Sequence, residues 1–162
     1  MSYSIVVNIA EQSLSVFSLQ NHLIKHYRIA TAKNGAGEKF GSECTPRGKH
    51  IIRAKIGDKQ PVNSVFIGRR PTGEIYEPAL KKQHPNRDWI LTRILWLSGL
   101  EKGTNRLSDV DTMRRYVYIH GCPDGDQMGI PSSHGCIKMR NSEMIELFNL
   151  VPVFTTVEII EK

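Results

Sequence analysis

Short runs of β-favouring residues, separated by turn formers about every ten positions, dominate the first third of the chain. Ser4 to Asn8 alternates apolar and polar residues, Leu14 to Leu19 repeats the alternation, and Leu23 to Ala30 continues it. Another run, His50 to Ile56, follows the turn at Thr45-Pro46-Arg47-Gly48. This spacing is typical of an antiparallel β domain, so we expect a mainly β fold.

The second half of the chain is expected to add three strands and one helix. Residues 89–97 are long enough for a helix, but their β-branched and aromatic residues favour a strand buried on both faces. Residues 116–119 and 154–160 are also predicted to be strands. The helix is expected to begin at Asn141, a good N-cap, and to stop at Pro152.

The length of the chain fits one domain, and we expect residues 1–162 to form it. Residues 57–88 are polar and rich in Gly, Pro and Lys, with one short apolar segment at 65–67. Stretches of this length without periodicity are commonly functional. We therefore expect a loop excursion over one end of the sheet, a candidate lid.

Charge and hydropathy limit the expected partners. The net charge is +6, but the basic residues are scattered pairs without interleaved aromatic residues, so no nucleic acid is expected. No apolar run approaches the roughly 18 residues that span a bilayer, so no membrane insertion is expected. The N-terminus lacks a signal-peptide pattern, which favours a cytoplasmic protein, or an envelope protein whose export signal has been removed. We expect a monomer.

The tripeptide His-Gly-Cys occurs twice, at His120-Gly121-Cys122 and at His134-Gly135-Cys136. Two imidazoles and two thiols this close together allow either a Cys/His acyl-transfer site or a four-ligand zinc site. In extended backbone the His and Cys of each copy share one face and could chelate a metal. Structural zinc sites, however, normally separate their cysteines by two or more residues. We expect no metal site and keep a zinc-binding module as the alternative.

Cys136 has the sequence context of a nucleophile. It precedes the expected helix by a few residues, where N–H groups and positive charge would lower the pKa of its thiol. N–H groups around Gly135 and Cys136 could form an oxyanion hole. His120, at the end of an expected strand, is placed to act as the base, and Lys138 could bind a substrate carboxylate.

The segments Ile119-His120-Gly121 and Ser133-His134-Gly135-Cys136-Ile137-Lys138-Met139, followed by Asn141, resemble the signature of the YkuD-type L,D-transpeptidase catalytic domain. The likeness extends over nearly the whole chain. It implies a β-sandwich-like single domain with one helix following the catalytic cysteine. It also implies a cysteine acyltransferase of bacterial cell-wall chemistry, for which we expect no cofactor.

The resemblance assigns a role to each residue of the signature. Cys136 would be the nucleophile and His120 the general base, with the main-chain carbonyl of Gly121 orienting the imidazole. The other positions would supply oxyanion N–H groups, support the loop or bind substrate: His134, Gly135, Ser133, Asn141 and Lys138.

Three positions depart from the family pattern. Lys138 stands where the family commonly has Arg, which keeps the charge but loses bidentate carboxylate geometry. Phe154 replaces a Gly near the end of the chain. Cys122 falls where the family often has Thr or another small residue, and we interpret it as incidental. With Cys44 it completes an odd set of three cysteines, which argues against a disulfide framework.

The implied reaction begins when the Cys136 thiolate attacks the carbonyl between the third, L-centred residue of a peptidoglycan stem peptide and its terminal D-Ala. D-Ala leaves, protonated by His120, and a thioester remains. An amine acceptor would then give a 3→3 crosslink, whereas water would make the chain an L,D-carboxypeptidase that trims tetrapeptides in the cytoplasm. The expected partners are therefore stem peptides or muropeptide precursors.

Overall fold

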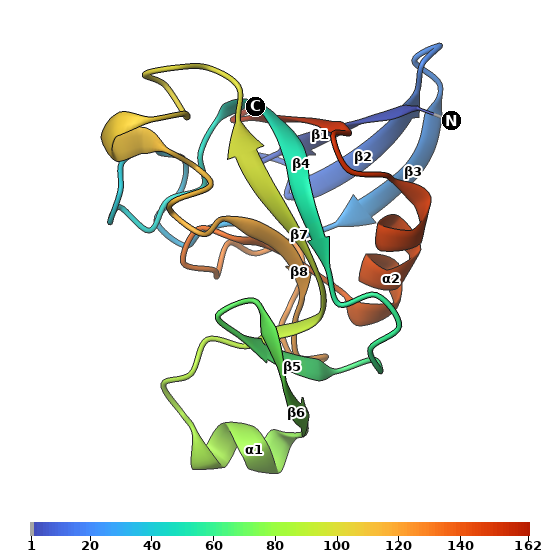
Figure 1. The fold of residues 1–162 in the computed structure, drawn as a ribbon, viewed down its shortest axis with the longest axis vertical. Coiled ribbons are helices and arrows are strands. Elements are labelled where there is room, and N and C mark those ends of the chain that lie inside the picture. The colour runs from blue at the N-terminus through green and yellow to red at the C-terminus, as the bar shows by residue number, and fades with distance from the viewer. Residues whose placement is uncertain (1) are drawn as a thin grey trace.

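The computed structural model describes residues 2–162, which form a mainly β structure (Figure 1). Ten strands belong to one curled sheet in this part of the chain, in the order β3-β2-β1-β10-β4-β7-β5-β6, with β8 paired to β7 and β9 to β8. The strands are β1 (Tyr3–Asn8), β2 (Ser13–Ser18), β3 (Leu23–Arg28), β4 (Gly48–Ile56), β5 (Ser64–Ile67), β6 (Arg70–Ile75), β7 (Ile90–Gly99), β8 (Tyr118–Gly121), β9 (Ile137–Met139) and β10 (Thr156–Ile160). The helices are α1 (Pro78–Gln83), α2 (Asn141–Leu150) and the 3-10 turn Ser108–Val110.

The core lies between the sheet and α2, which packs against β7 and β8. The period-2 pattern of the first strands turns one set of their apolar residues inward, where they meet the apolar face of α2. The buried residues of these elements include Ile5, Val7, Leu14, Val16, Met144 and Leu147. Burial of this face fixes α2 against β7 and β8, the second of which carries His120.

Strand β7 organises the functional end of the sheet. Residues 94–99 of β7 pair with β4, Ile90 and Leu91 pair with β5, and β8 pairs with Leu91 and with residues 94–96. The register with β8 shifts between Leu91 and Ile94, and Thr92 has a φ of 76° in the left-handed region. This β-bulge lies between Leu91, which pairs with both β5 and β8, and the stretch from Ile94 that pairs with β4 and β8.

The predictions of a mainly β fold and of one helix following Cys136 are confirmed, and residues 89–97 are indeed a buried strand. The loop excursion predicted over residues 57–88 contains secondary structure as well as loop, and its role as a lid stays a prediction. This excursion contains β5, β6 and α1, which project from the end of β7 as an arm (Figure 1). β5 has only four residues and α1 only six, none of them buried in α1, so neither element carries a readable periodicity. No helix within residues 2–162 is long and apolar enough to cross a bilayer.

The predicted N-cap of the helix is wrong by one residue. Arg140, with φ −63° and ψ 143°, occupies the N-cap position, and Asn141 is the first residue of α2. The Arg140 side chain makes no capping bond, and the Asn141 side chain is buried in a polar network at the end of β8. The tertiary contacts of this amide have overridden its local preference for the cap.

Candidate active site

Cys136 and His120 come together where β8 and β9 run parallel. His120 lies opposite Lys138 in this pair, and Cys136 immediately precedes β9. The Cys136 sulfur is held by main-chain groups: it lies 3.3 Å from the N–H of Tyr118 and 3.4 Å from the carbonyl oxygen of Tyr116. His120 and Cys136 line one cavity of about 390 Å³. The pairing of the two strands therefore brings the predicted nucleophile and base to the same site.

The His120 imidazole is buried and oriented by its own strand. Its Nδ1 lies 2.6 Å from the main-chain oxygen of Gly121, which can only accept, so Nδ1 carries the proton. Burial lowers the pKa of His120, although Asp88 and the Gly121 carbonyl oppose this effect. The ring is therefore neutral at pH 7, with an unprotonated Nε2 able to take a proton.

Gly121 is enclosed so tightly that no side chain fits there. A Cβ at this position would overlap the amide oxygen of Asn141 and lie 2.7 Å from the carbonyl oxygen of Leu91. The Asn141 amide donates to the carbonyl oxygen of Cys122 and to Asn63 Oδ1, both at 2.9 Å. Its oxygen accepts a 2.6 Å hydrogen bond from the Thr92 hydroxyl. This network fixes the end of β8 and, with it, the carbonyl that orients His120.

The Cys136 thiol differs from the expectation of a low pKa. Burial raises the pKa of Cys136 to about 12, with Asp88 adding to the effect and the Tyr118 N–H and Arg115 opposing it. The physical reason is topological: β9 stands between Cys136 and α2, so the thiol does not lie at the helix N-terminus. At rest the pair is a neutral thiol beside a neutral imidazole, and the thiol must lose its proton during attack.

The loop before Cys136 is held by its own hydrogen bonds. The Ser133 hydroxyl donates to the carbonyl oxygen of Cys136 and accepts from the Gly135 N–H at 3.2 Å. The Gly135 N–H is therefore engaged, which leaves the N–H groups of His134 and Cys136 as candidates for the predicted oxyanion hole. Gly135 has a φ of 129°, and a Cβ there would lie 3.2 Å from the carbonyl oxygen of Cys44.

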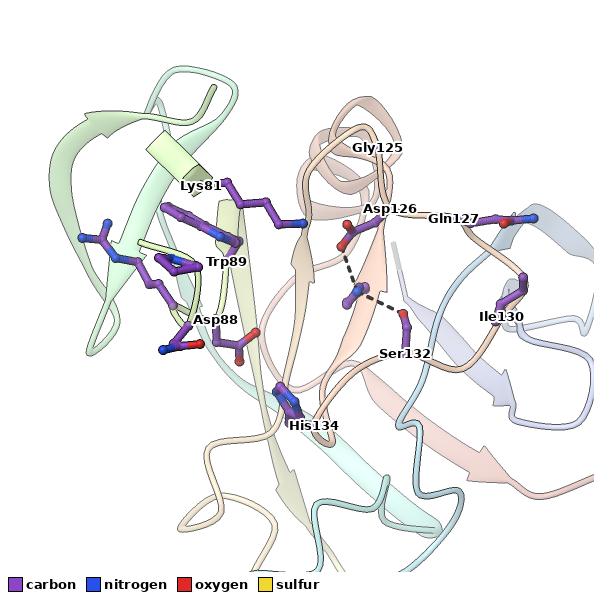
Figure 2. A pocket seen from close by; sticks show the side chains of 13 residues that line it. Lys81, Asp88, Trp89, Gly125, Asp126, Gln127, Ile130, Ser132 and His134 are labelled. Carbon is purple, nitrogen blue, oxygen red and sulfur yellow. Dashed lines mark hydrogen bonds and ion pairs between the residues drawn. The ribbon is translucent and has the colours of Figure 1, made fainter. Parts of the chain in front are cut away.

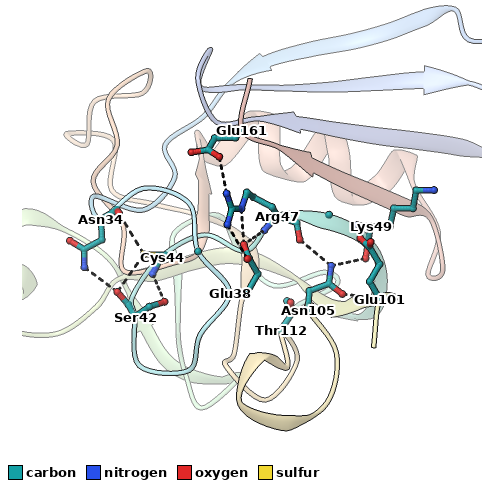
Figure 3. Close-up of polar contacts among 12 residues, drawn as sticks. Asn34, Glu38, Ser42, Cys44, Arg47, Lys49, Glu101, Asn105, Thr112 and Glu161 are labelled. Carbon is teal, nitrogen blue, oxygen red and sulfur yellow. Dashed lines mark hydrogen bonds and ion pairs between the residues drawn. The ribbon is translucent and has the colours of Figure 1, made fainter. Parts of the chain in front are cut away.

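A polar network anchors residues 34–47 next to this loop (Figure 3). Arg47 bonds to Glu38 and to Glu161, each at 2.9 Å, which ties the segment to the end of the chain. Ser42 accepts a hydrogen bond from the Cys44 N–H at 3.2 Å. Sequence reasoning left Cys44 without a role; the structure places it in the wall behind Gly135.

Arg115 lies between this wall and the thiol, and sequence reasoning missed it. Its guanidinium donates to the carbonyl oxygens of Gly37, Glu38 and Cys44 and to the Ser42 hydroxyl, at 2.6 to 3.3 Å. It also lines the cavity of Cys136. Arg69, Asp88, Tyr116 and Tyr118 line the same cavity and were likewise not singled out. Their only sequence signal was charge or aromaticity, which is common on any surface.

A second cavity of about 640 Å³ lies between the arm and the loop that follows β8 (Figure 2). Asp88 and His134 line both cavities, so the two spaces meet beside Cys136 and His120. Lys138 faces this second cavity, where its ammonium pairs with Asp126 at 2.8 Å and bonds to Ser132 at 3.0 Å. Its charge is already compensated, and its binding of a substrate carboxylate stays a prediction.

The four His and Cys side chains of the two His-Gly-Cys copies do not form one cluster, because Cys122 lies apart from Cys136 and His120. The Cys122 thiol is buried beside Ala30 and Met128 and donates to the carbonyl oxygen of Met139 at 3.3 Å. Residues 2–162 contain no group of three or more His, Cys, Asp or Glu side chains arranged to hold a metal ion. The geometry thus gives the zinc alternative no ligand set.

Comparison with known proteins points to one family. The family model YkuD, described as the L,D-transpeptidase catalytic domain, matches residues 2–159. A search of the curated proteins gives no match. Similar solved structures include an L,D-transpeptidase from Mycobacterium smegmatis, with 19% identity and a TM-score of 0.57, covering 98% of this chain and 58% of that one. An Enterococcus faecium L,D-transpeptidase gives 18% identity and a TM-score of 0.58, covering 99% and 50%. L,D-transpeptidase 3 from Mycobacterium tuberculosis gives 13% identity and a TM-score of 0.59, covering 99% and 61%. The chain thus spans about half to three fifths of the length of these proteins, and the likeness to them is one of fold.

Proposed function

Because the chain belongs to the YkuD family of L,D-transpeptidase catalytic domains, we propose that it cleaves the bond before the terminal D-Ala of a peptidoglycan stem peptide through a thioester on Cys136. The acyl group then passes to an amine and forms a 3→3 crosslink. The observation that carries this proposal is the pair itself: a buried, neutral His120, fixed by the Gly121 carbonyl, shares a cavity with the Cys136 thiol.

Acylation starts with both groups neutral. As the sulfur attacks the carbonyl carbon, Nε2 of His120 accepts the thiol proton, so the thiolate exists only while the new bond forms. The resulting imidazolium is stabilised by the Gly121 carbonyl 2.6 Å from Nδ1. Collapse of the tetrahedral intermediate breaks the C–N bond, His120 returns the proton to the amine, and D-Ala leaves. The raised thiol pKa is consistent with this order of events.

The second half of the reaction reverses the first with a new partner. An acceptor amine enters the space that D-Ala has left, His120 accepts its proton, and the sulfur is expelled from the thioester. The meeting of two cavities beside Cys136 supports transfer to a second peptide, because one cavity can hold the acyl chain while the other admits the amine. If water enters instead, the product is a tripeptide, and the chain acts as an L,D-carboxypeptidase.

The test supplies a purified disaccharide tetrapeptide and follows the products by liquid chromatography and mass spectrometry. Crosslinked dimer with release of D-Ala is the expected product, and Cys136→Ala and His120→Ala should each abolish D-Ala release. Tripeptide without dimer, at peptide concentrations up to the millimolar range, would replace the transferase with the carboxypeptidase. Release of D-Ala by the Cys136→Ala variant would contradict the mechanism altogether.

A further inference from the structure

Arg69 lines the cavity of Cys136, and a tight turn sets the position of its main chain. It lies in the two-residue turn between β5 and β6, where Gly68 and Arg69 both have positive φ angles, 57° and 64°. Two-residue hairpin loops of this kind are rigid and hold their residues in one direction. The base of the Arg69 side chain is thus set by the tight turn rather than by a mobile loop.

Three aromatic residues hold the guanidinium. Its Cζ lies 4.7 Å from the ring centroid of Trp96 and 4.7 Å from that of Tyr116, and Nη1 donates to the Tyr118 hydroxyl at 3.0 Å. Stacking occupies the flat faces of a guanidinium but not its edge, where the N–H groups point. This contact with the Tyr118 hydroxyl is the one hydrogen bond recorded for the Arg69 side chain within residues 2–162.

The same tyrosines hold the nucleophile. The main chain of Tyr116 and Tyr118 contacts the Cys136 sulfur, while their side chains contact Arg69. Arg69 and Cys136 consequently line one cavity. A pre-oriented guanidinium in the cavity of an acylating thiol is suited to a carboxylate close to the bond that is attacked.

Of the cationic side chains near Cys136, Arg69 is the one available to bind a substrate carboxylate. Arg115 lines the same cavity, but four oxygen atoms of the segment from Gly37 to Cys44 already accept from its guanidinium. Lys138 faces the other cavity and is paired with Asp126. Asp88 is the one carboxylate among the residues that line the cavity of Cys136.

We propose that Arg69 binds the C-terminal carboxylate of the peptide that Cys136 cleaves, and so makes the site specific for a bond one residue from a free C-terminus. This inference rests on the proposed function. In such a peptide the carboxylate carbon is three bonds from the attacked carbonyl carbon, through the amide nitrogen and one Cα. The two groups must therefore be recognised within one small cavity. The D-Ala side of the substrate lies in the cavity of Arg69, and the rest of the stem occupies the larger one.

The proposal also applies to the acceptor. The amine that attacks the thioester takes the place of the leaving amine, so an amine with a carboxylate on the same carbon should be preferred over a simple alkylamine. Arg69 would then select both the residue that leaves and the residue that replaces it.

The experiment compares a tetrapeptide that ends in a free carboxylate with the same tetrapeptide ending in an amide. Charge-assisted hydrogen bonds predict a preference in kcat/KM of about 10- to 100-fold for the free acid in the unaltered chain. Arg69→Met should bring the acid-to-amide ratio in kcat/KM close to one, whatever its effect on the absolute rate. Arg69→Lys should restore only part of the preference. The matched control is Arg70→Met, because Arg70 is exposed at the start of β6 and should keep the full preference.

Binding of both peptides to the Cys136→Ala chain, measured by calorimetry, provides a readout without turnover. Discrimination between acid and amide that Arg69→Met removes supports the inference even where no cleavage occurs, and then the proposed function alone falls. Cleavage with an acid-to-amide ratio near one, or with a ratio that Arg69→Met leaves unchanged, overturns the inference alone. Neither cleavage nor discrimination in binding overturns both.

Discussion

Asn141→Asp is the substitution that most directly tests how the end of β8 is held. The new carboxyl group has nearly the shape of the amide but cannot donate a hydrogen bond while ionised. Three oxygen atoms face the donor side of Asn141: the Cys122 carbonyl and Asn63 Oδ1 at 2.9 Å, and Asp124 Oδ1 at 3.2 Å. The substitution therefore replaces the hydrogen-bond donor of residue 141 with an acceptor, in a buried position where the neighbouring groups are acceptors too.

The magnitude follows from these contacts. Two lost hydrogen bonds cost about 1 kcal/mol each, and leaving two buried oxygens unpaired beside a new charge adds about 1 to 3 kcal/mol. We expect the free energy of unfolding to fall by about 3 to 5 kcal/mol at pH 8, and Tm to fall by roughly 10 °C or more. Activity should fall as well, because the Gly121 carbonyl that orients His120 belongs to the same network.

Urea unfolding at pH 8 and at pH 5 measures how much the substitution lowers the free energy of unfolding. Protonation gives the carboxyl group an O–H donor, and its surroundings raise its pKa in the folded state, so the loss should be smaller at pH 5 than at pH 8. Asn149→Asp is the matched control, because Asn149 is exposed on the same helix and should change the free energy of unfolding by less than about 1 kcal/mol. A loss at Asn141 no larger than at Asn149, or one that does not depend on pH, would refute the reasoning.

Three other expectations follow from buried polar groups. Alkylation of Cys136 by iodoacetamide, followed by peptide mapping, should be slow at pH 7 and still rise above pH 9, because burial raises the thiol pKa to about 12; a midpoint below pH 8 would contradict this. Burial lowers the pKa of His50 to about 4, so the unfolded chain binds a proton at His50 before the folded chain does as pH falls below 6.5. The free energy of unfolding, measured with urea, should therefore be about 2 to 3 kcal/mol lower at pH 4.5 than at pH 7. His50→Gln should reduce this difference. Ser133→Ala removes a hydrogen bond to the Cys136 carbonyl and should lower kcat about ten-fold, with KM nearly unchanged; an unaltered kcat would exclude a positioning role for Ser133.

Sequence periodicity was sufficient for β1 because this strand is half-buried and alternates accordingly, whereas β7, which is buried along most of its length, was recognised by its β-branched and aromatic residues. The arm was not predictable in this way. Its helix α1 buries no residue, and β5 is too short for an alternation to stand out. These elements exist because β5 pairs with β7, a long-range contact that no local pattern records.

The proximity of Cys136 and His120 could be predicted because an acyl-transfer site needs one thiol and one imidazole in a recognisable setting. The surroundings could not, because they depend on which way a side chain turns after folding. Asn141 has the local preference of an N-cap, yet its amide is buried under β8. Arg69 and Arg115 look alike as charged pairs in the sequence, but one is stacked on aromatic rings and the other is bonded to main-chain oxygens.

The segment from Tyr116 to Tyr118 contacts both the Cys136 sulfur and the Arg69 guanidinium, but it uses different atoms for each. Its hydrogen bonds to the thiol come from main-chain atoms, which every amino acid other than proline presents alike. It touches Arg69 only through its rings and a hydroxyl, which vary freely. Substitution at these two tyrosines is therefore expected to change how Arg69 is held while the main-chain hydrogen bonds to the sulfur remain.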